Sequence, residues 1–430
     1  MPAGVERVDD AVEAGRPVDA SAGRAATASG TGKRAWRVVL GFGVVSLAAD
    51  MVYEGARSVY GPLLASLGAS AVVVGLTTGA GEAVALLLRL VSGPLADRTR
   101  RYWTLTIFGY GLTAVCVPLL AVTPALGGAG LAVAAVLILA ERLGKAVRSP
   151  AKSALLADAA SRVGMGRGLG VHKALDQVGA FAGPLIVAAI IASSAGLLWP
   201  ALAALAAPAV VAMLLLFAIR SRAQPSRAAA GGPAPQASPA AGRKSLPARF
   251  HWFAVAMALC TAGLVTFGLI GFHLVRAGVV ATAAVPLMYA AAMAAGAVAA
   301  LATGMSYDRA GPWMLVVLPA MIAGVPALVF GGGLPAPVAG ILVWGAAVGV
   351  QDSTVKALVA ELVPRDSRAT AYGIFAAVQG AGALAGGAAA GLLYEQSVTS
   401  LVAAVALVQA VALLTLIGVL VRNKPSDAVT

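Results

Sequence analysis

The sequence predicts an all-α membrane protein with 12 transmembrane helices in two six-helix halves that repeat one another. Of the 430 residues, 60% are hydrophobic and only 11% are charged, and the mean hydropathy is +0.88. A soluble domain usually has about a quarter charged residues. Twelve apolar segments follow one another along the chain, and one long polar stretch divides them into two groups of six.

Each apolar segment has about 20 residues, the length that a helix needs to cross the hydrocarbon core. In the N-terminal half, 36–219, the segments are 36–60, 71–96, 102–122, 128–148, 169–192 and 199–219. In the C-terminal half, 250–421, they are 250–275, 282–306, 312–332, 335–357, 368–393 and 399–421.

The rest of the chain is polar. Residues 1–35 lack the apolar core of a signal peptide and are predicted to be a disordered tail. The linker, 220–249, is rich in Ala, Pro, Gly, Ser and Arg, a composition that cannot bury a core. Residues 422–430 form a short C-terminal tail.

Lys and Arg residues predict the orientation, because cytoplasmic loops carry an excess of them. The loops on one side of the predicted spans are basic, and so are the linker and both tails. The loops on the other side contain a single basic residue, Arg276. Both tails and the linker are therefore predicted to be cytoplasmic, in a bacterial inner membrane. The net charge of +13 reflects this topology, so no nucleic-acid partner is expected.

Cofactor chemistry has little support in the sequence. Cys116 and Cys260 both lie in apolar segments, and the three histidines lack the spacing of metal ligands. No phosphate-binding loop of the Gly-x-x-x-x-Gly-Lys-Ser/Thr type is present. We therefore expect no metal, no cofactor and no built-in ATPase, and a monomer in contact with the lipid bilayer.

Charged residues inside the spans are the first functional candidates, because each costs about 2.5–3.5 kcal/mol at the bilayer centre. A carboxylate in a low dielectric can load and release protons, so Asp50, Glu54 and Glu82 are the leading proton carriers, followed by Asp176. The alternative is a structural salt bridge, such as Glu54 with Arg57 or Glu82 with Arg89. The proton-coupling and cavity candidates are Asp50, Glu54, Arg57, Glu82, Arg142, Asp176, Asp352 and Lys356.

The placement of these charges follows helical spacing. Asp50, Glu54 and Arg57 share one face of the first span, as Asp352 and Lys356 do in the tenth. The third, sixth, ninth and twelfth spans contain no charge, which predicts that they face the lipid. Five of the six acids in the spans belong to the N-terminal half, which favours cationic substrates slightly, although basic neighbours offset them. Cations, zwitterions and anions all stay open.

Two motifs recur in the two halves. Gly93, Asp97 and Arg98 after the second span match Gly304, Asp308 and Arg309 after the eighth. In the fifth span, Gly170, Gly179, Gly183 and Pro184 match Gly373, Gly382, Gly386 and Gly387 of the eleventh at an offset of 203 residues. Two matches in equivalent spans predict an internal duplication, which is typical of transporters.

From about 36 to 421 the chain resembles the major facilitator superfamily. Gly93, Asp97 and Arg98 look like the family's loop motif, although Arg100 stands where its second glycine is expected. In the second copy Gly311 keeps that glycine, and Pro312 follows it. The resemblance implies that this motif latches the two halves in the outward-open state.

Two further motifs bear on function. Gly170, Gly179, Gly183 and Pro184 resemble the family's antiporter and exporter motif, with Val187-Ala188 in place of its closing Gly-Gly. Packing between the halves is the alternative interpretation of these glycines. Arg142 and Lys145 resemble the fourth-span motif, whose arginine is implicated in proton transfer.

These features predict a secondary active transporter, not an enzyme, that works by alternating access. It moves a small molecule and, we expect, exchanges it for protons, as an exporter of drugs or metabolites. A proton-coupled nutrient importer would use the same carboxylates. A membrane-embedded lipid-modifying enzyme is a more distant alternative, because no sizeable loop domain is visible.

Overall fold

The computed structural model describes residues 20–161, 163–222, 246–364 and 367–421. Among these residues every regular element is a helix, which confirms the all-α fold. Ten segments are long and apolar enough to cross a membrane, and several of them, such as Tyr102–Ala160, contain more than one of the helices described below. The count of twelve spans in two halves stays a prediction.

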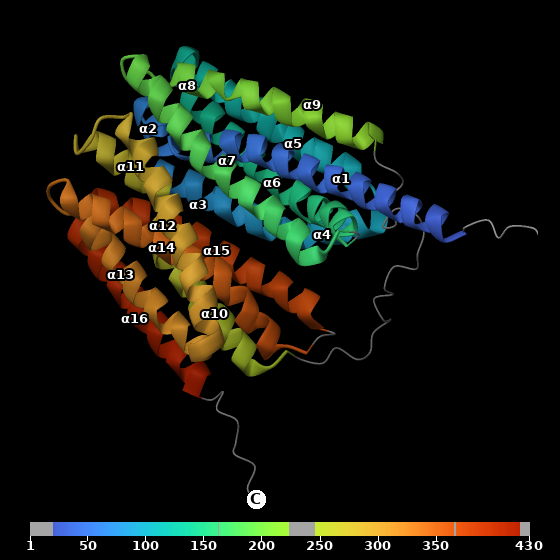
Figure 1. The fold of residues 1–430 in the computed structure, drawn as a ribbon. Helices are drawn as coiled ribbons and strands as arrows, with labels where there is room; N and C mark the ends of the chain where they lie inside the picture. The colour runs from blue at the N-terminus through green and yellow to red at the C-terminus, as the bar shows by residue number, and fades with distance from the viewer. Residues whose placement is uncertain (1–19, 162, 223–245, 365–366, 422–430) are drawn as a thin grey trace, which may run out of the picture.

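The helices fall into two groups in Figure 1, coloured blue to green and yellow to red. We call the first group the N-terminal bundle. Its α-helices are α1 (Ala20–Arg57), α2 (Tyr60–Ser66), α3 (Ala71–Leu87), α4 (Arg89–Thr99), α5 (Tyr102–Leu119), α6 (Gly130–Ala160), α7 (Met165–Ser193), α8 (Trp199–Ala204) and α9 (Ala206–Arg222). A 3-10 helix, η1 (Leu120–Ala129), joins α5 to α6.

The second group is the C-terminal bundle. Its α-helices are α10 (Ala248–Gly263), α11 (Phe267–Arg276), α12 (Ala284–Ala310), α13 (Val317–Val329), α14 (Pro335–Leu362), α15 (Arg368–Gln396) and α16 (Val398–Val421), with the 3-10 helix η2 (Gly311–Val316) before α13. The predicted tails and linker lie largely outside the described residues. Helix α1 nevertheless begins at Ala20, so part of the predicted tail is helical, as its recurrent alanines favour.

Several predicted spans are interrupted helices. The segment 250–275 divides into α10 and α11 because Leu264 and Thr266 leave helical geometry. Thr266 caps α11, and its hydroxyl accepts a hydrogen bond from the backbone N–H of Leu269. The indole N–H of Trp344 donates to the Val265 carbonyl at 2.8 Å, which satisfies a backbone group that the break exposes.

The two bundles meet mainly where α3 packs against α15, α7 against α12, and α2 against α11, with smaller contacts of α3 with α11 and of α4 with α15. Figure 1 shows that they diverge toward the side where α1 begins and α16 ends. We call this side the open face and the other side the closed face. Close backbone packing occurs toward the closed face, where a Cβ at Gly75 would overlap the carbonyl oxygen of Gly387.

The outer helices match the expectation from charge placement. Helices α5, α9, α13 and α16 correspond to the third, sixth, ninth and twelfth predicted spans, and large apolar side chains such as Phe108, Leu214, Val317 and Leu414 are exposed on them. None of these four helices contributes a described residue to the central cavity. Of the helices that correspond to charged spans, α1, α3, α4, α6 and α14 line the cavity, whereas α7 contributes no described residue to it.

Candidate functional site

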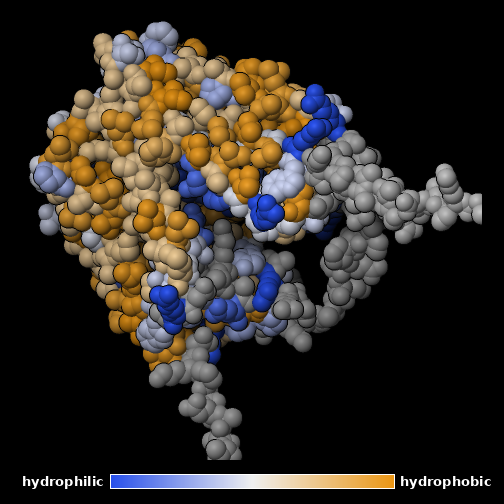
Figure 2. Space-filling model, viewed as in Figure 1, coloured by the Kyte–Doolittle hydropathy of each residue, from blue (hydrophilic) through white to orange (hydrophobic). Residues whose placement is uncertain are grey.

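A cavity of about 310 Å³ lies between the two bundles. Its described lining residues come from α1, α3, α4 and α6 on one side and from α10, α14, α15 and the α10–α11 break on the other. Figure 2 shows a hollow with hydrophilic residues between the two lobes. The volume is at the lower end of the about 300–1,000 Å³ that small-molecule sites occupy, so a small molecule fits it.

Ion pairs between helices dominate the wall that the N-terminal bundle contributes. One carboxylate oxygen of Glu82 in α3 lies 2.6 Å from a guanidinium nitrogen of Arg57 in α1 and 3.4 Å from one of Arg142 in α6. Glu82 therefore joins three helices. The alternative pairing of Glu82 with Arg89, expected from their common helix face, is wrong, because helical spacing does not reveal which residues lie across the bundle.

Arg142, which also contacts Glu82, is almost fully buried. It donates a hydrogen bond to the Tyr53 hydroxyl, and its Nε lies 3.6 Å from the carboxylate of the buried Glu141. The ammonium of Lys145 lies 3.5 Å from the centre of the Tyr53 ring. The negative face of an aromatic ring attracts such a cation, so Tyr53 orders two basic side chains of α6.

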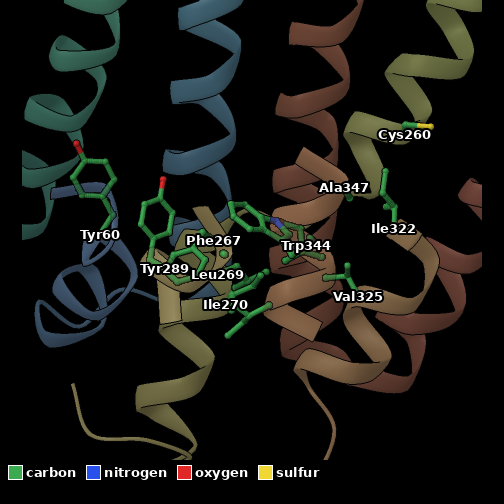
Figure 3. Close-up of a cluster of buried hydrophobic side chains, with 14 of the residues drawn as sticks. Tyr60, Cys260, Phe267, Leu269, Ile270, Tyr289, Ile322, Val325, Trp344 and Ala347 are labelled. Atoms are coloured by element: carbon green, nitrogen blue, oxygen red, sulfur yellow. The ribbon is translucent and has the colours of Figure 1, made fainter. Parts of the chain in front are cut away.

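Glu54 connects the two bundles. Its carboxylate accepts a hydrogen bond from the hydroxyl of Tyr289 in α12 and lies 3.8 Å from Arg57. The pairing of Glu54 with Arg57 was expected from their spacing, whereas Tyr289 was not found from the sequence. Tyr289 is buried beside Phe267, with ring centres 4.6 Å apart, and Figure 3 shows this pair together with Trp344.

A second polar contact joins the bundles beside the cavity. The hydroxyls of Thr78 in α3 and Thr266 at the start of α11 lie 2.8 Å apart. Thr266 also lines the cavity, so this hydrogen bond lies between the cavity and the tightly packed closed face.

The wall from the C-terminal bundle is neutral apart from one acid among the described residues. Gln351 and Gln379 both donate to the hydroxyl of Thr261, at 2.8 and 3.4 Å. Trp344 and Phe375 add aromatic surface. The acid is Asp352, which is exposed on the half of α14 that leads to the open face. The side chain of Lys356, expected on the same helix face, lies outside the described residues.

Asp50 does not line the cavity. It interacts instead with Asp176 across the contact between α1 and α7. Lys173 pairs with Asp176 at 2.8 Å, and Lys152 and Lys145 act on Asp50 electrostatically. Two neighbouring carboxylates repel each other when both are charged, and the lysines around this pair offset part of that repulsion.

The residue that closes the repeated loop motif has a positive φ in both copies, although the two backbone conformations differ: ψ is 15° at Arg100 and −156° at Gly311. Arg100, which follows α4, has a positive φ of 53°, and Gly311, which follows α12, has a φ of 62°. Glycine adopts a positive φ more easily than arginine, which explains why the family motif has a glycine at this position. Asp97 accepts a hydrogen bond from the Tyr102 hydroxyl at 3.1 Å.

The other residues of the loop motif make few described contacts. Gly93 has open space around it, and Arg98 and Arg309 are exposed. A Cβ at Gly304 would lie in ordinary contact with Ser353. The side chain of Asp308 lies outside the described residues. The latching role of this motif stays a prediction.

The glycines of the fifth span pack helices within one bundle. A Cβ at Gly179 or Gly183 of α7 would overlap the backbone of Leu47 or Met51 in α1. Packing between the halves, considered from the sequence, is therefore wrong for these two glycines. In the C-terminal bundle, Gly382 and Gly386 of α15 lie in the same way against Ala258 and Ala262 of α10.

The remaining residues of this motif do not share that packing. Gly170 has open space around it, and Pro184 is buried within α7. The structure thus brings Arg57, Glu82, Arg142 and Asp352 to the cavity, places Glu54 at the contact between the bundles, and pairs Asp50 with Asp176. Tyr289 and Lys145 are the functional candidates whose contacts the sequence did not predict. A phenol carries no charge signal, and only the fold brings Lys145 to the Tyr53 ring.

An all-helical chain with many apolar spans and one polar cavity between two helical bundles defines a polytopic membrane protein with a central site. A sequence model of the Major Facilitator Superfamily matches residues 42–387. The chain belongs to this family of membrane transporters.

Similar proteins agree with this assignment. An uncharacterized protein of Mycobacterium tuberculosis is 51% identical over 394 residues, which cover 91% of this chain and 95% of that protein. An uncharacterized MFS-type transporter of Methanocaldococcus jannaschii is 26% identical over 141 residues, 33% of this chain and 34% of its own length.

Solved structures show the same fold. A variant of the nucleoside transporter NupG has a TM-score of 0.71 at 14% identity, with 89% of this chain and 99% of that chain covered. A peptide transporter in complex with sulfate has a TM-score of 0.66 at 16% identity, with 89% and 93% covered. At these identities the likeness concerns the fold alone.

Proposed function

We propose that this protein is a secondary active transporter that exports a small molecule in exchange for protons by alternating access. The polar cavity between two bundles, closed toward one face by direct contacts, is the observation that carries the proposal. Rocking of the bundles would break the contacts of Thr78 with Thr266 and of Glu54 with Tyr289, and would expose the cavity to the closed face.

The orientation in this proposal follows from charge. The open face carries the basic ends of the helices, such as Arg98, Arg220 and Arg309, and the closed face carries Arg276. By the positive-inside rule the open face is cytoplasmic, in a bacterial inner membrane, with both termini on that side. The structure then corresponds to the inward-open state of the transport cycle.

Proton coupling is assigned to the pair of Asp50 and Asp176. The two carboxyl groups belong to α1 and α7, which pack against each other, and neither lines the cavity. Loss of the shared proton would leave two like charges in contact and favour a rearrangement of α1 against α7. Glu82, in contrast, is held between Arg57 and Arg142, so we assign it to the organisation of the cavity.

Export as the direction rests on the fifth-span motif. Gly179 and Gly183 allow α7 to lie directly against α1, which carries Asp50. A rearrangement at this contact would link proton release to movement of the bundle. A proton-coupled importer is the second candidate, because the same carboxyl pair would serve it.

Dye-loaded everted membrane vesicles provide the test. Respiration acidifies their lumen, and a pH-sensitive dye reports proton release when a transported compound is added. Within a panel of anionic, zwitterionic and cationic drugs, we expect at least one compound to release protons from vesicles that contain the protein. Asp50→Asn should abolish the response, and Glu361→Gln, which changes an exposed acid whose partner, Tyr307, belongs to the same bundle, should keep it.

Two results would contradict the proposal. An unchanged response in Asp50→Asn would remove the carboxyl pair from the coupling mechanism. Counterflow that runs with the proton gradient, from the outside to the cytoplasm, would replace the exporter with the importer.

A further inference from the structure

The cavity has an excess of positive charge. Its described lining residues include four cations, Arg57, Arg89, Arg142 and Lys145, against the two acids Glu82 and Asp352. The sequence favoured cationic substrates slightly, because five of the six acids in the predicted spans belong to the N-terminal half. Many of those acids, such as Asp50 and Glu141, face neighbouring helices and not the cavity.

Glu82 does not offset this excess for a ligand. Its carboxylate already contacts Arg57 at 2.6 Å and Arg142 at 3.4 Å, so these two guanidinium groups neutralise its negative charge. Asp352 is exposed on the half of α14 that leads to the open face. A ligand cation in the cavity would therefore meet more like charges than opposite ones.

Two of the four cations have no acidic partner among the described residues. No described carboxylate lies within 4.0 Å of Lys145 or Arg89, whereas Arg57 and Arg142 each contact one or more. Lys145 rests on the Tyr53 ring, which keeps its ammonium N–H groups free for another acceptor. The Nε of Arg89 is buried without a hydrogen-bond partner. Both side chains line the cavity.

The opposite wall offers a different kind of contact. The indole N–H of Trp344 donates a hydrogen bond to the Val265 carbonyl, so Trp344 can contact a ligand only through its ring surface. The side-chain amides of Gln351 and Gln379 donate hydrogen bonds to Thr261, and their side-chain carbonyl oxygens can still accept hydrogen bonds. This wall suits an uncharged planar group with a hydrogen-bond donor.

We propose that the cavity takes a small organic anion, with its carboxylate or phosphate at Lys145 and Arg89 and its planar uncharged body against Trp344 and Phe375. This inference deepens the proposed transport function and rests on it. The anion would supply the acceptor atoms that the two cations lack. Its body would bridge the N-terminal and C-terminal bundles, which is what a transported molecule must do to stabilise a closed state.

A set of probes that share one ring separates charge from shape. Benzoate is an anion, benzamide is neutral and benzamidine is a cation, and phenyl phosphate tests the second anionic group. Binding is measured as the concentration that half-saturates the increase in Tm of the full-length protein in detergent. We expect benzoate or phenyl phosphate to bind about tenfold tighter than benzamide, since hydrogen bonds to charged groups are the stronger ones, and benzamidine to bind weakest.

Variants locate the site. Lys145→Gln and Arg89→Gln should each remove the preference for the anions, whereas Lys145→Arg should keep it, because the charge stays. Arg276→Gln is the matched control, since it removes one exposed cation at the closed face. Preserved far-UV circular dichroism and a cooperative transition in each variant show that the fold is intact, and Lys145→Arg provides the comparison if Lys145→Gln fails to fold.

Several results would overturn the inference. Tightest binding of benzamidine would make the cavity a cation site, with Asp352 as its anchor. Equal affinity for all probes, no binding of either anion, or an equal effect of Arg276→Gln would show that Lys145 and Arg89 select no charge. Alternating access is followed independently by the distance between labels at Ser66→Cys and Ala277→Cys. A distance that stays fixed in every condition would contradict the transport proposal, whereas an intact change without anion preference would contradict the substrate class alone.

Discussion

The two walls of the cavity differ, although the bundles that form them repeat one packing scheme. The contacts of Gly179 and Gly183 with α1 recur in Gly382 and Gly386 with α10, and Arg100 and Gly311 share a positive φ. The wall from the N-terminal bundle nevertheless holds five charged residues, while the described part of the other wall holds only Asp352. The repeat thus sets the architecture, and the divergence between the copies places ligand recognition on one side.

The largest effect is expected at Arg142, which contacts Glu82 in the charged wall and the buried Glu141 behind it. Arg142→Met would leave the buried Glu141 without its guanidinium partner, and an unpaired buried charge costs about 3–5 kcal/mol. The free energy of unfolding in detergent should fall by that amount. The double variant Glu141→Gln/Arg142→Met should regain a large part of it, because the buried charge is gone. A double variant as unstable as Arg142→Met would contradict the role of Glu141 as the orphaned group.

A smaller effect is expected where the two walls are linked. Tyr289→Phe removes the hydroxyl that donates to Glu54 across the bundles, and a hydrogen bond to a charged group is worth about 1.5–3 kcal/mol. The conformational equilibrium should shift toward separation of the closed face by about tenfold or more. Tyr394→Phe is the control, because its hydroxyl lies 2.8 Å from His273 within the C-terminal bundle. Equal shifts in both variants would show that the link is not specific.

The backbone contact between the bundles gives a third comparison. Gly75→Ala would place a Cβ against the carbonyl of Gly387, and overpacking of this kind costs about 1–3 kcal/mol. Labels at the closed face should move apart in this variant. Gly111→Ala in α5 meets open space and should leave the label distance unchanged. If Gly75→Ala also left it unchanged, the closed face would not depend on this contact.

The smallest effect concerns the loop motif, where one copy has Arg100 and the other has Gly311 at the equivalent position. Arg100 occupies the left-handed region, which costs a non-glycine residue about 1–2 kcal/mol. Arg100→Gly should therefore have a higher Tm than Arg100→Ala, which removes the same side chain and keeps the strain. A higher Tm for the alanine variant would mean that the loop does not hold this conformation in solution.

Much of the fold could be predicted from the sequence. Hydropathy located the helices, and the absence of charge marked α5, α9, α13 and α16 as the outer ones. The breaks between helices were missed because hydropathy averages over them. Thr266 was a usable signal for the α10–α11 break, since threonine is a common helix cap.

The sequence identified many residues of the site but predicted few of the contacts between them. Spacing along a helix correctly joined Glu54 to Arg57, because both lie on one face of α1. It could not join Glu82 to Arg142 or Asp50 to Asp176, since those contacts depend on which helices are neighbours. A count of acids in the spans also does not show which of them face the cavity. The basic character of the cavity is therefore visible only in the folded structure.

The central claim is that the two bundles rock about this cavity, and paired spin labels test it most directly. The native cysteines, Cys116 and Cys260, are buried, so labels can be confined to introduced positions. One pair, Ser66→Cys with Ala277→Cys, spans the closed face, and the other, Thr99→Cys with Thr370→Cys, spans the open face. Between acidic and alkaline buffer, we predict that one distance increases while the other decreases, and that Asp50→Asn suppresses both changes. Distances that move in the same direction, or that both stay fixed, would contradict alternating access.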